Sequence, residues 1–259
     1  MRIPFIAIAF LLAACGGGGG GGSSTVEPPP PVTGPADFAL LFMGNSHTAS
    51  HDLPNTVAAM VRAARPGRTV SIDVAPDWGF LEDHAGNPRT LELLDRRRWS
   101  FVVLQAQKYS SSGQFLYPIE PAIELARKSR MSGAVPIMFP EWPRRGINET
   151  QRIYDLHLSI AQREPACVAP IPQAFDMALA RNPELVLHDA DGNHSAPAGA
   201  YLAALVIAST MTGTAPDQLP PVSRPGVDAN TQALLRRAAA DTVLAYPPRQ
   251  WCPADAYPP

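Results

Sequence analysis

The sequence has 259 residues, of which 46% are hydrophobic, and a formal net charge of −2. This length and apolar content are sufficient for one α/β domain with a buried core and additional terminal segments. Lysine and arginine are scattered among acidic residues, without the basic clusters that binding to phosphates requires, which argues against a nucleic-acid-binding protein.

The N-terminus is typical of a secreted bacterial protein. Met1-Arg2 is positively charged, residues 3–12 are apolar, and Leu12-Ala13-Ala14-Cys15 places small residues and a cysteine at the cleavage position. About ten apolar residues are too few to span a bilayer as a helix. The tetrapeptide resembles the bacterial lipobox, which implies a signal peptide over residues 1–14 and lipidation of Cys15. The alternative is a plain signal peptide that ends in cysteine.

Residues 15–35 have the composition of a tether. A run of glycines and two serines, residues 16–24, is typical of a flexible linker, and the prolines at 28–31 are typical of a stiff one. The tether would hold a domain that begins near Ala36 away from the membrane. Cys15 is followed by Gly16 and not by aspartate. In the bacterial lipoproteins that this segment resembles, such a residue indicates that the protein is sorted to the outer membrane of the cell envelope.

Strand-like and helix-like patterns alternate from residue 36 to residue 215. Short apolar or alternating runs predict strands, and apolar residues three or four positions apart predict helices. In chain order, the sequence predicts strand 38–43, helix 53–64, strand 69–75, loop 77–88, a short helix around Leu91 and Leu94, strand 100–104, loop 109–113, helix 118–131, strand 134–139, helix 150–163, strand 167–171, helix 173–181 and helix 198–211.

This alternation implies βαβ units with right-handed crossovers. The predicted fold over residues 36–215 is therefore a three-layer α/β/α sandwich with a parallel, flavodoxin-like sheet. Residues 216–259 contain one further amphipathic helix, 229–245, and a Pro-rich tail. We expect both to pack on the same domain.

If Cys15 carries lipid, two cysteines remain. Cys167 and Cys252 can form a disulfide in an oxidising envelope compartment, and the Pro-rich tail around Cys252 has little else to hold it in place. We therefore expect a bridge between them. The alternative is a buried Cys167 in a strand and a free thiol at Cys252.

Ser46 is the first candidate for a nucleophile. The predicted strand 38–43 ends at Gly44-Asn45-Ser46, and ligands of open α/β sheets bind outside the carboxyl ends of the strands. A serine hydroxyl at this position lies where chemistry is expected. The segment is also consistent with an ordinary turn, because glycine accepts positive φ and Asn or Ser can bond back to the backbone.

The base that would activate this hydroxyl is expected before the helix 198–211. Asp191 and His194 are three residues apart in a turn that contains Gly192, so the carboxylate can bond one imidazole nitrogen while the other faces Ser46. Asp189 is the alternative carboxylate. An Asp-rich turn can also bind Ca²⁺, but the regular spacing of calcium loops is absent.

These motifs together resemble the SGNH or GDSL hydrolase superfamily. The similarity rests on Gly44-Asn45-Ser46, on Asp52-Leu53-Pro54, and on Asp191-x-x-His194 followed by Ser195-Ala196-Pro197-Ala198-Gly199-Ala200-Tyr201-Leu202-Ala203, and it extends from residue 38 to residue 213. The resemblance implies a Ser46-His194-Asp191 catalytic triad.

The resemblance also implies an oxyanion hole, whose donors must point at the charge that develops during attack. The Ser46 amide and Gly79, in the loop after the second strand, fit two of its positions. No Gly-x-Asn-Asp follows the third strand. We assign Gln105 to the third position, with Gln107 as the alternative.

Several other polar residues have two interpretations each. His84 either lines the cleft or is merely solvated, and Glu141, after the fourth strand, either shapes the pocket or caps a loop. His47, His51 and His188 suggest a metal site, but no Cys or carboxylate cluster accompanies them at ligand spacing. We predict neither a metal nor another cofactor.

The sequence therefore predicts a membrane-tethered serine hydrolase that cleaves carboxylic esters through an acyl-serine intermediate. An O-acyl ester of a carbohydrate is an expected substrate by family analogy alone. The alternative is an envelope lipoprotein that retains this fold and binds a glycan or protein partner without turnover, which the atypical third block favours and the complete triad opposes. Acyl transfer to another hydroxyl is a variant of the first hypothesis.

Overall fold

The computed structural model describes residues 36–254. The predicted signal peptide 1–14, the tether 15–35 and the lipidation of Cys15 lie outside these residues. Within the described range, no helix is both long enough and apolar enough to cross a membrane.

Five parallel strands form a single sheet in the order β2-β1-β3-β4-β5. Their bounds are Phe38–Met43 (β1), Val70–Val74 (β2), Phe101–Leu104 (β3), Val135–Met138 (β4) and Cys167–Val168 (β5). This confirms the predicted parallel sheet of flavodoxin-like order. Because β1 lies between β2 and β3, its carboxyl end lies at the point of the sheet edge where the strand order reverses.

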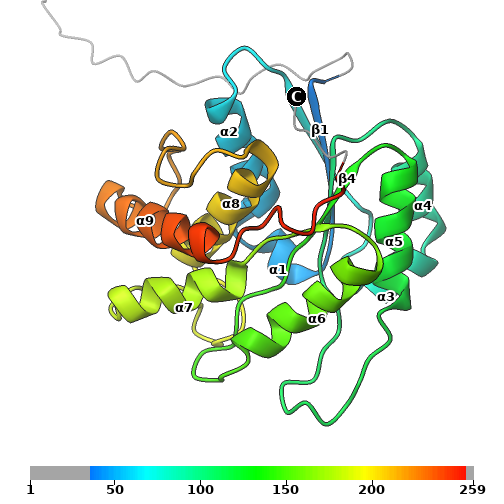
Figure 1. Ribbon diagram of the computed structural model, residues 1–259. Coiled ribbons are helices and arrows are strands. Elements are labelled where there is room, and N and C mark those ends of the chain that lie inside the picture. The colour runs from blue at the N-terminus through cyan, green and yellow to red at the C-terminus, as the bar shows by residue number, and fades with distance from the viewer. Residues whose placement is uncertain (1–35, 255–259) are drawn as a thin grey trace, which may run out of the picture. The chain divides into compact units, whose positions relative to one another are not determined.

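Helices cover both faces of the sheet, as Figure 1 shows. Leu40 and Phe42 of β1 face one core, whereas Leu41 and Met43 face the other, because successive side chains of a strand point in opposite directions. The first core is closed by α2 (Leu53–Ala64), α7 (Ile171–Arg181), α8 (Pro197–Thr212) and α9 (Ala229–Ala245), and the second by α3 (Leu81–Gly86), α4 (Pro88–Asp95), α5 (Glu120–Met131) and α6 (Thr150–Arg163).

Helix α8 is the buried centre of the first layer. Its residues from Ala198 to Thr212 are all buried, which explains why it is apolar on every side. Helix α9 packs against it, and the Tyr201 hydroxyl of α8 donates a hydrogen bond of 3.0 Å to Gln232 Oε1 of α9. The segment after residue 215 thus contributes to the same core.

Two predicted segments differ from the structure. The expected loop 77–88 contains α3, which begins where Asp83 accepts a hydrogen bond from the Phe80 N–H and Leu81 enters the second core. The expected strand 167–171 is shorter, because Ile171 already begins α7 behind Pro170, which has no N–H to pair in a sheet.

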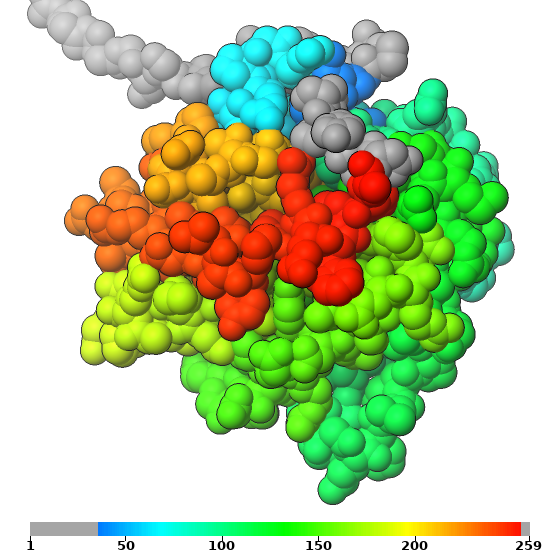
Figure 2. Space-filling model, in the orientation of Figure 1, coloured from blue at the N-terminus to red at the C-terminus, as the bar shows by residue number. Residues whose placement is uncertain are grey.

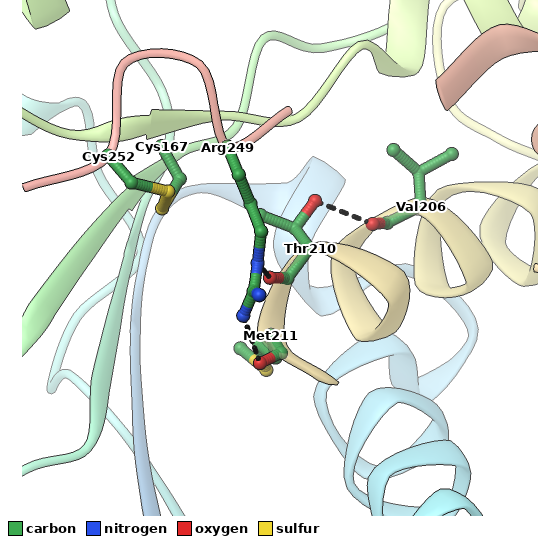
Figure 3. Close-up of a disulfide and its surroundings, with 6 residues drawn as sticks. All are labelled: Cys167, Val206, Thr210, Met211, Arg249 and Cys252. Atoms are coloured by element: carbon green, nitrogen blue, oxygen red, sulfur yellow. Dashed lines mark hydrogen bonds between the residues drawn. A yellow bond between two sulfur atoms is a disulfide. The ribbon is translucent and has the colours of Figure 1, made fainter. Parts of the chain in front are cut away.

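The C-terminal segment is fastened at two points. A disulfide joins Cys167 of β5 to Cys252, the pair expected from the sequence (Figure 3). Close by, Arg249 donates hydrogen bonds to Thr210 O and Met211 O, which are carbonyls at the end of α8 that lack helical partners. Figure 2 shows this segment, in red, on the surface beside the orange α9.

Candidate active site

Ser46 lies at the start of a short helix that the sequence did not predict. Helix α1 (Ser46–Ala49) and the 3-10 turn η1 (Ser50–Asp52) precede α2. The side chain of Asn45 caps α1 by accepting the His47 N–H at 3.0 Å. Ser46 itself is exposed, so its hydroxyl is presented at the carboxyl end of β1.

Gly44 is required by the close packing beneath the nucleophile. A Cβ at this position would lie 2.5 Å from Gln105 Oε1 and closer still to Thr48 Oγ1. The Gly44 N–H donates to His84 Nε2 at 3.0 Å, and His84 is buried. His84 is therefore neither solvated nor part of the cleft wall; it fixes the backbone that leads to Ser46.

The segment from Asp191 to His194 is a turn closed by a carboxylate. Asp191 Oδ1 accepts the N–H groups of Asn193 and His194, both at 2.9 Å, while Gly192 supplies a φ of +69°. The second oxygen, Oδ2, accepts the His194 Nδ1–H at 2.6 Å. These hydrogen bonds, that from the His194 ring most strongly, hold the pKa of Asp191 below its usual range.

The turn brings His194 to Ser46. With its Nδ1 proton donated to Asp191, the imidazole accepts at Nε2, and the Ser46 hydroxyl lies 2.9 Å from that atom. A hydroxyl, an imidazole and a carboxylate connected in this order are the arrangement by which serine hydrolases generate a nucleophile. The structure thus brings together the three residues that the sequence proposed as a triad.

Two of the remaining histidines hold the turn against the helix that begins at Ser46. His47 Nε2 donates to Asn193 O at 3.2 Å and its ring stacks on that of His194, while His51 Nε2 donates to Ser195 O at 2.8 Å. The Asp189 carboxylate lies 3.7 Å from His51 and bonds no atom of His194; only the Asp189 backbone N–H does, by donating to His194 O at 2.9 Å. Asp191, not Asp189, is therefore the carboxylate partner of His194.

The residues expected to complete the oxyanion hole are already engaged. The Gly79 N–H donates to Gly44 O at 3.0 Å, so this amide is not available to a substrate. Gln105 is fully buried, and both ends of its side-chain amide are bonded within the protein. Gln107 Nε2 donates to Lys108 O and Pro118 O. In the structure these donors therefore bond other groups of the protein, which corrects the oxyanion-hole roles expected for Gly79 and Gln105 and the alternative role of Gln107.

Glu141 contacts two of the residues that surround Ser46, Gln105 and His47. Its Oε2 accepts the Gln105 Nε2–H at 3.0 Å and lies 3.9 Å from His47 Nδ1. Burial raises the pKa of the Glu141 carboxyl, although the nearby His47 and the bond from Gln105 act in the opposite direction. Its position after β4 was the only sign in the sequence that this residue belongs to the site.

A cavity of about 750 Å³ opens over Ser46 and His194. Its wall includes the aromatic side chains of Trp78, Phe80 and Tyr117, which are between 36% and 53% exposed. A volume of this size is typical of sites for small molecules. Exposed aromatic rings beside the candidate nucleophile give the cavity an apolar surface on which part of a ligand could rest.

No family model and no curated protein match the sequence. Solved structures are nevertheless similar. A proposed SGNH hydrolase from Slackia heliotrinireducens is 25% identical with a TM-score of 0.55, over 67% of this chain and 98% of that protein. A DUF4886 family protein from Bacteroides uniformis is 18% identical with a TM-score of 0.57, over 81% and 95% of the two chains. A proposed GDSL-like lipase from Parabacteroides merdae is 12% identical with a TM-score of 0.52, over 69% and 96%.

Proposed function

We propose that this chain, which has the fold of the SGNH/GDSL hydrolase superfamily, is a serine esterase that cleaves carboxylic esters. The observation that carries the proposal is the connected series from Ser46 Oγ to His194 Nε2, at 2.9 Å, and from His194 Nδ1 to Asp191 Oδ2, at 2.6 Å. This series faces a cavity large enough for a small ester.

In the first half-reaction, Ser46 Oγ attacks the acyl carbonyl while His194 Nε2 takes the hydroxyl proton. Asp191 keeps the proton of His194 on Nδ1 and stabilises the imidazolium that forms. The tetrahedral intermediate then collapses, the bond to the alcohol breaks, and His194 returns the proton to the leaving oxygen. The product of this step is an acyl ester on Ser46.

In the second half-reaction, His194 takes a proton from water, whose oxygen attacks the acyl-serine. The carboxylic acid leaves and the proton returns to Ser46 Oγ, so the enzyme is regenerated. A sugar hydroxyl in place of water would give acyl transfer by the same steps. In both routes His194 is the group that takes and returns the proton.

The aromatic wall of the cavity supports an ester whose alcohol is a sugar. Trp78 and Tyr117 line the cavity and are exposed, and the apolar faces of sugar rings can pack on aromatic rings. We therefore include O-acylated carbohydrate in the proposed substrate class. With the lipidation proposed for Cys15, the enzyme would act at the bacterial cell envelope.

Substitution of the nucleophile tests the proposal. Ser46→Ala is expected to lower kcat/KM for p-nitrophenyl acetate or an acetylated sugar by about 10⁴-fold or more, because no other hydroxyl among residues 36–254 bonds His194. Ser112→Ala, an exposed serine in the loop before α5, is the matched control and should retain full activity. Equal hydrolysis by Ser46→Ala and the unmodified protein would contradict the proposal and favour a binding protein without turnover.

A further inference from the structure

The proposed reaction requires hydrogen-bond donors for the oxyanion. Near Ser46, few N–H groups are free of a hydrogen bond to another group of the described residues. The Gly79 amide and the Gln105 side chain are bonded within the protein, as described above. The Ser46 N–H, at the first position of α1, has no acceptor within residues 36–254. One backbone donor alone is a sparse oxyanion hole.

The side chain of Asn45 offers the second donor. Its Oδ1 accepts the His47 backbone N–H at 3.0 Å and Gln105 Nε2 at 3.0 Å. Because a backbone N–H can only donate, this contact identifies the oxygen of the Asn45 amide and therefore also its nitrogen. Nδ2 has no acceptor in the described part of the chain, and Asn45 lines the cavity beside Ser46.

We propose that Asn45 Nδ2, together with the Ser46 N–H, donates the hydrogen bonds that stabilise the oxyanion. The inference rests on the proposed esterase function and assigns Asn45 a catalytic role that a simple turn or cap residue does not have. The two donors belong to adjacent residues, and both residues line the cavity in which the carbonyl would be attacked. They can therefore reach the same carbonyl oxygen once it is bound to Ser46.

Gln105 then becomes a positioning residue. It holds Asn45 at both ends, accepting the Asn45 N–H at Oε1 (2.9 Å) and donating from Nε2 to Oδ1 (3.0 Å). Gln105 is itself fixed by Thr48 Oγ1 at 2.8 Å and Glu141 Oε2 at 3.0 Å. This network fixes the Asn45 backbone and the oxygen of its amide before substrate arrives, and a fixed amide is the preorganisation that makes such donors effective.

Two substitutions of Asn45 distinguish its proposed role as a hydrogen-bond donor to the oxyanion from its role as the N-cap of α1. Asn45→Asp and Asn45→Ser both keep a side-chain oxygen that can cap α1, but both lose the amide N–H groups. We expect kcat to fall by about 10²- to 10³-fold in both variants while KM changes little, since the lost bond is made in the transition state. Asn87→Ser is the matched control: Asn87 caps α4 through the same contact, to the Arg89 N–H at 3.0 Å, but lies outside the cavity.

The second measurement is the affinity for phenylboronic acid, which adds to a serine hydroxyl and places a charged oxygen in the oxyanion hole. Affinity should weaken in both Asn45 variants by a factor similar to the loss in kcat, and remain unchanged in Asn87→Ser. Full kcat in Asn45→Asp and Asn45→Ser, or reduced kcat with unchanged boronate affinity, would overturn the role of Asn45. Failure of the unmodified protein to hydrolyse esters and to react at Ser46 would instead overturn the proposed function.

Discussion

Asp191→Asn is expected to lower kcat/KM for ester hydrolysis by about 10⁴-fold without unfolding the protein. The carboxylate accepts the His194 Nδ1–H at 2.6 Å and so keeps the lone pair of Nε2 directed at Ser46. An asparagine amide can present an N–H to Nδ1, which would move the imidazole proton to Nε2 and leave no base for the hydroxyl. Steady-state hydrolysis of an acetyl ester measures the loss.

The matched control for this substitution is Asp189→Asn, two residues earlier in the same turn. The Asp189 carboxylate is near His51 and makes no bond to His194, and the substitution keeps the backbone bond from the Asp189 N–H to His194 O, so we expect activity within a few-fold of the unmodified protein. A large loss in Asp189→Asn together with an active Asp191→Asn would reverse the two assignments. Because hydrogen bonds hold the pKa of Asp191 below its usual range, protonation of this carboxyl should not be the cause of any activity lost between pH 6 and pH 5.

Gly44→Ala is expected to impair both stability and activity. The added Cβ would lie within 2.5 Å of Gln105 Oε1 and nearer to Thr48 Oγ1, so either the backbone before Ser46 or the two side chains that hold it have to move. Overpacking of this kind destabilises by about 1–3 kcal/mol. Since displacement of reacting groups by about 1 Å can lower the rate about 10²-fold, we expect a loss of that order in kcat. Urea unfolding and ester kinetics measure the two effects.

Gly86→Ala provides the control, since nothing lies within 4 Å of the Cβ it would add at the end of α3. Its stability and activity should remain close to those of the unmodified protein. Unchanged kcat in Gly44→Ala would contradict the close packing described around Gly44.

Most of the fold could be predicted because, in its longer helices, the spacing of apolar residues in the sequence matches the face that is buried in the structure. Helices α2, α6 and α9 have the bounds expected from the sequence. The short elements were not predictable in this way. Helix α3 has only six residues, and tertiary contacts stabilise it through Leu81 in the second core and through the capping contact of Asp83.

The candidate site shows a similar division. Ser46, Asp191 and His194 could be proposed because two motifs with suitable chemistry lie at the expected ends of the domain. The donors around Ser46 could not be assigned, because the residue type does not reveal which amide groups are already bonded. By its residue type and its place after the third strand, Gln105 suits an oxyanion hole, but in the structure it is buried and holds Asn45.

Covalent labelling with a fluorophosphonate probe tests the central proposal, that His194 and Asp191 activate Ser46, most directly. We expect the full-length protein to gain one probe molecule, located by peptide mapping at Ser46, and Ser46→Ala to gain none. His194→Ala should label far more slowly, because the base that contacts Ser46 Oγ at 2.9 Å is absent. Absence of labelling in the folded, unmodified protein, or labelling that persists in Ser46→Ala, would contradict the account.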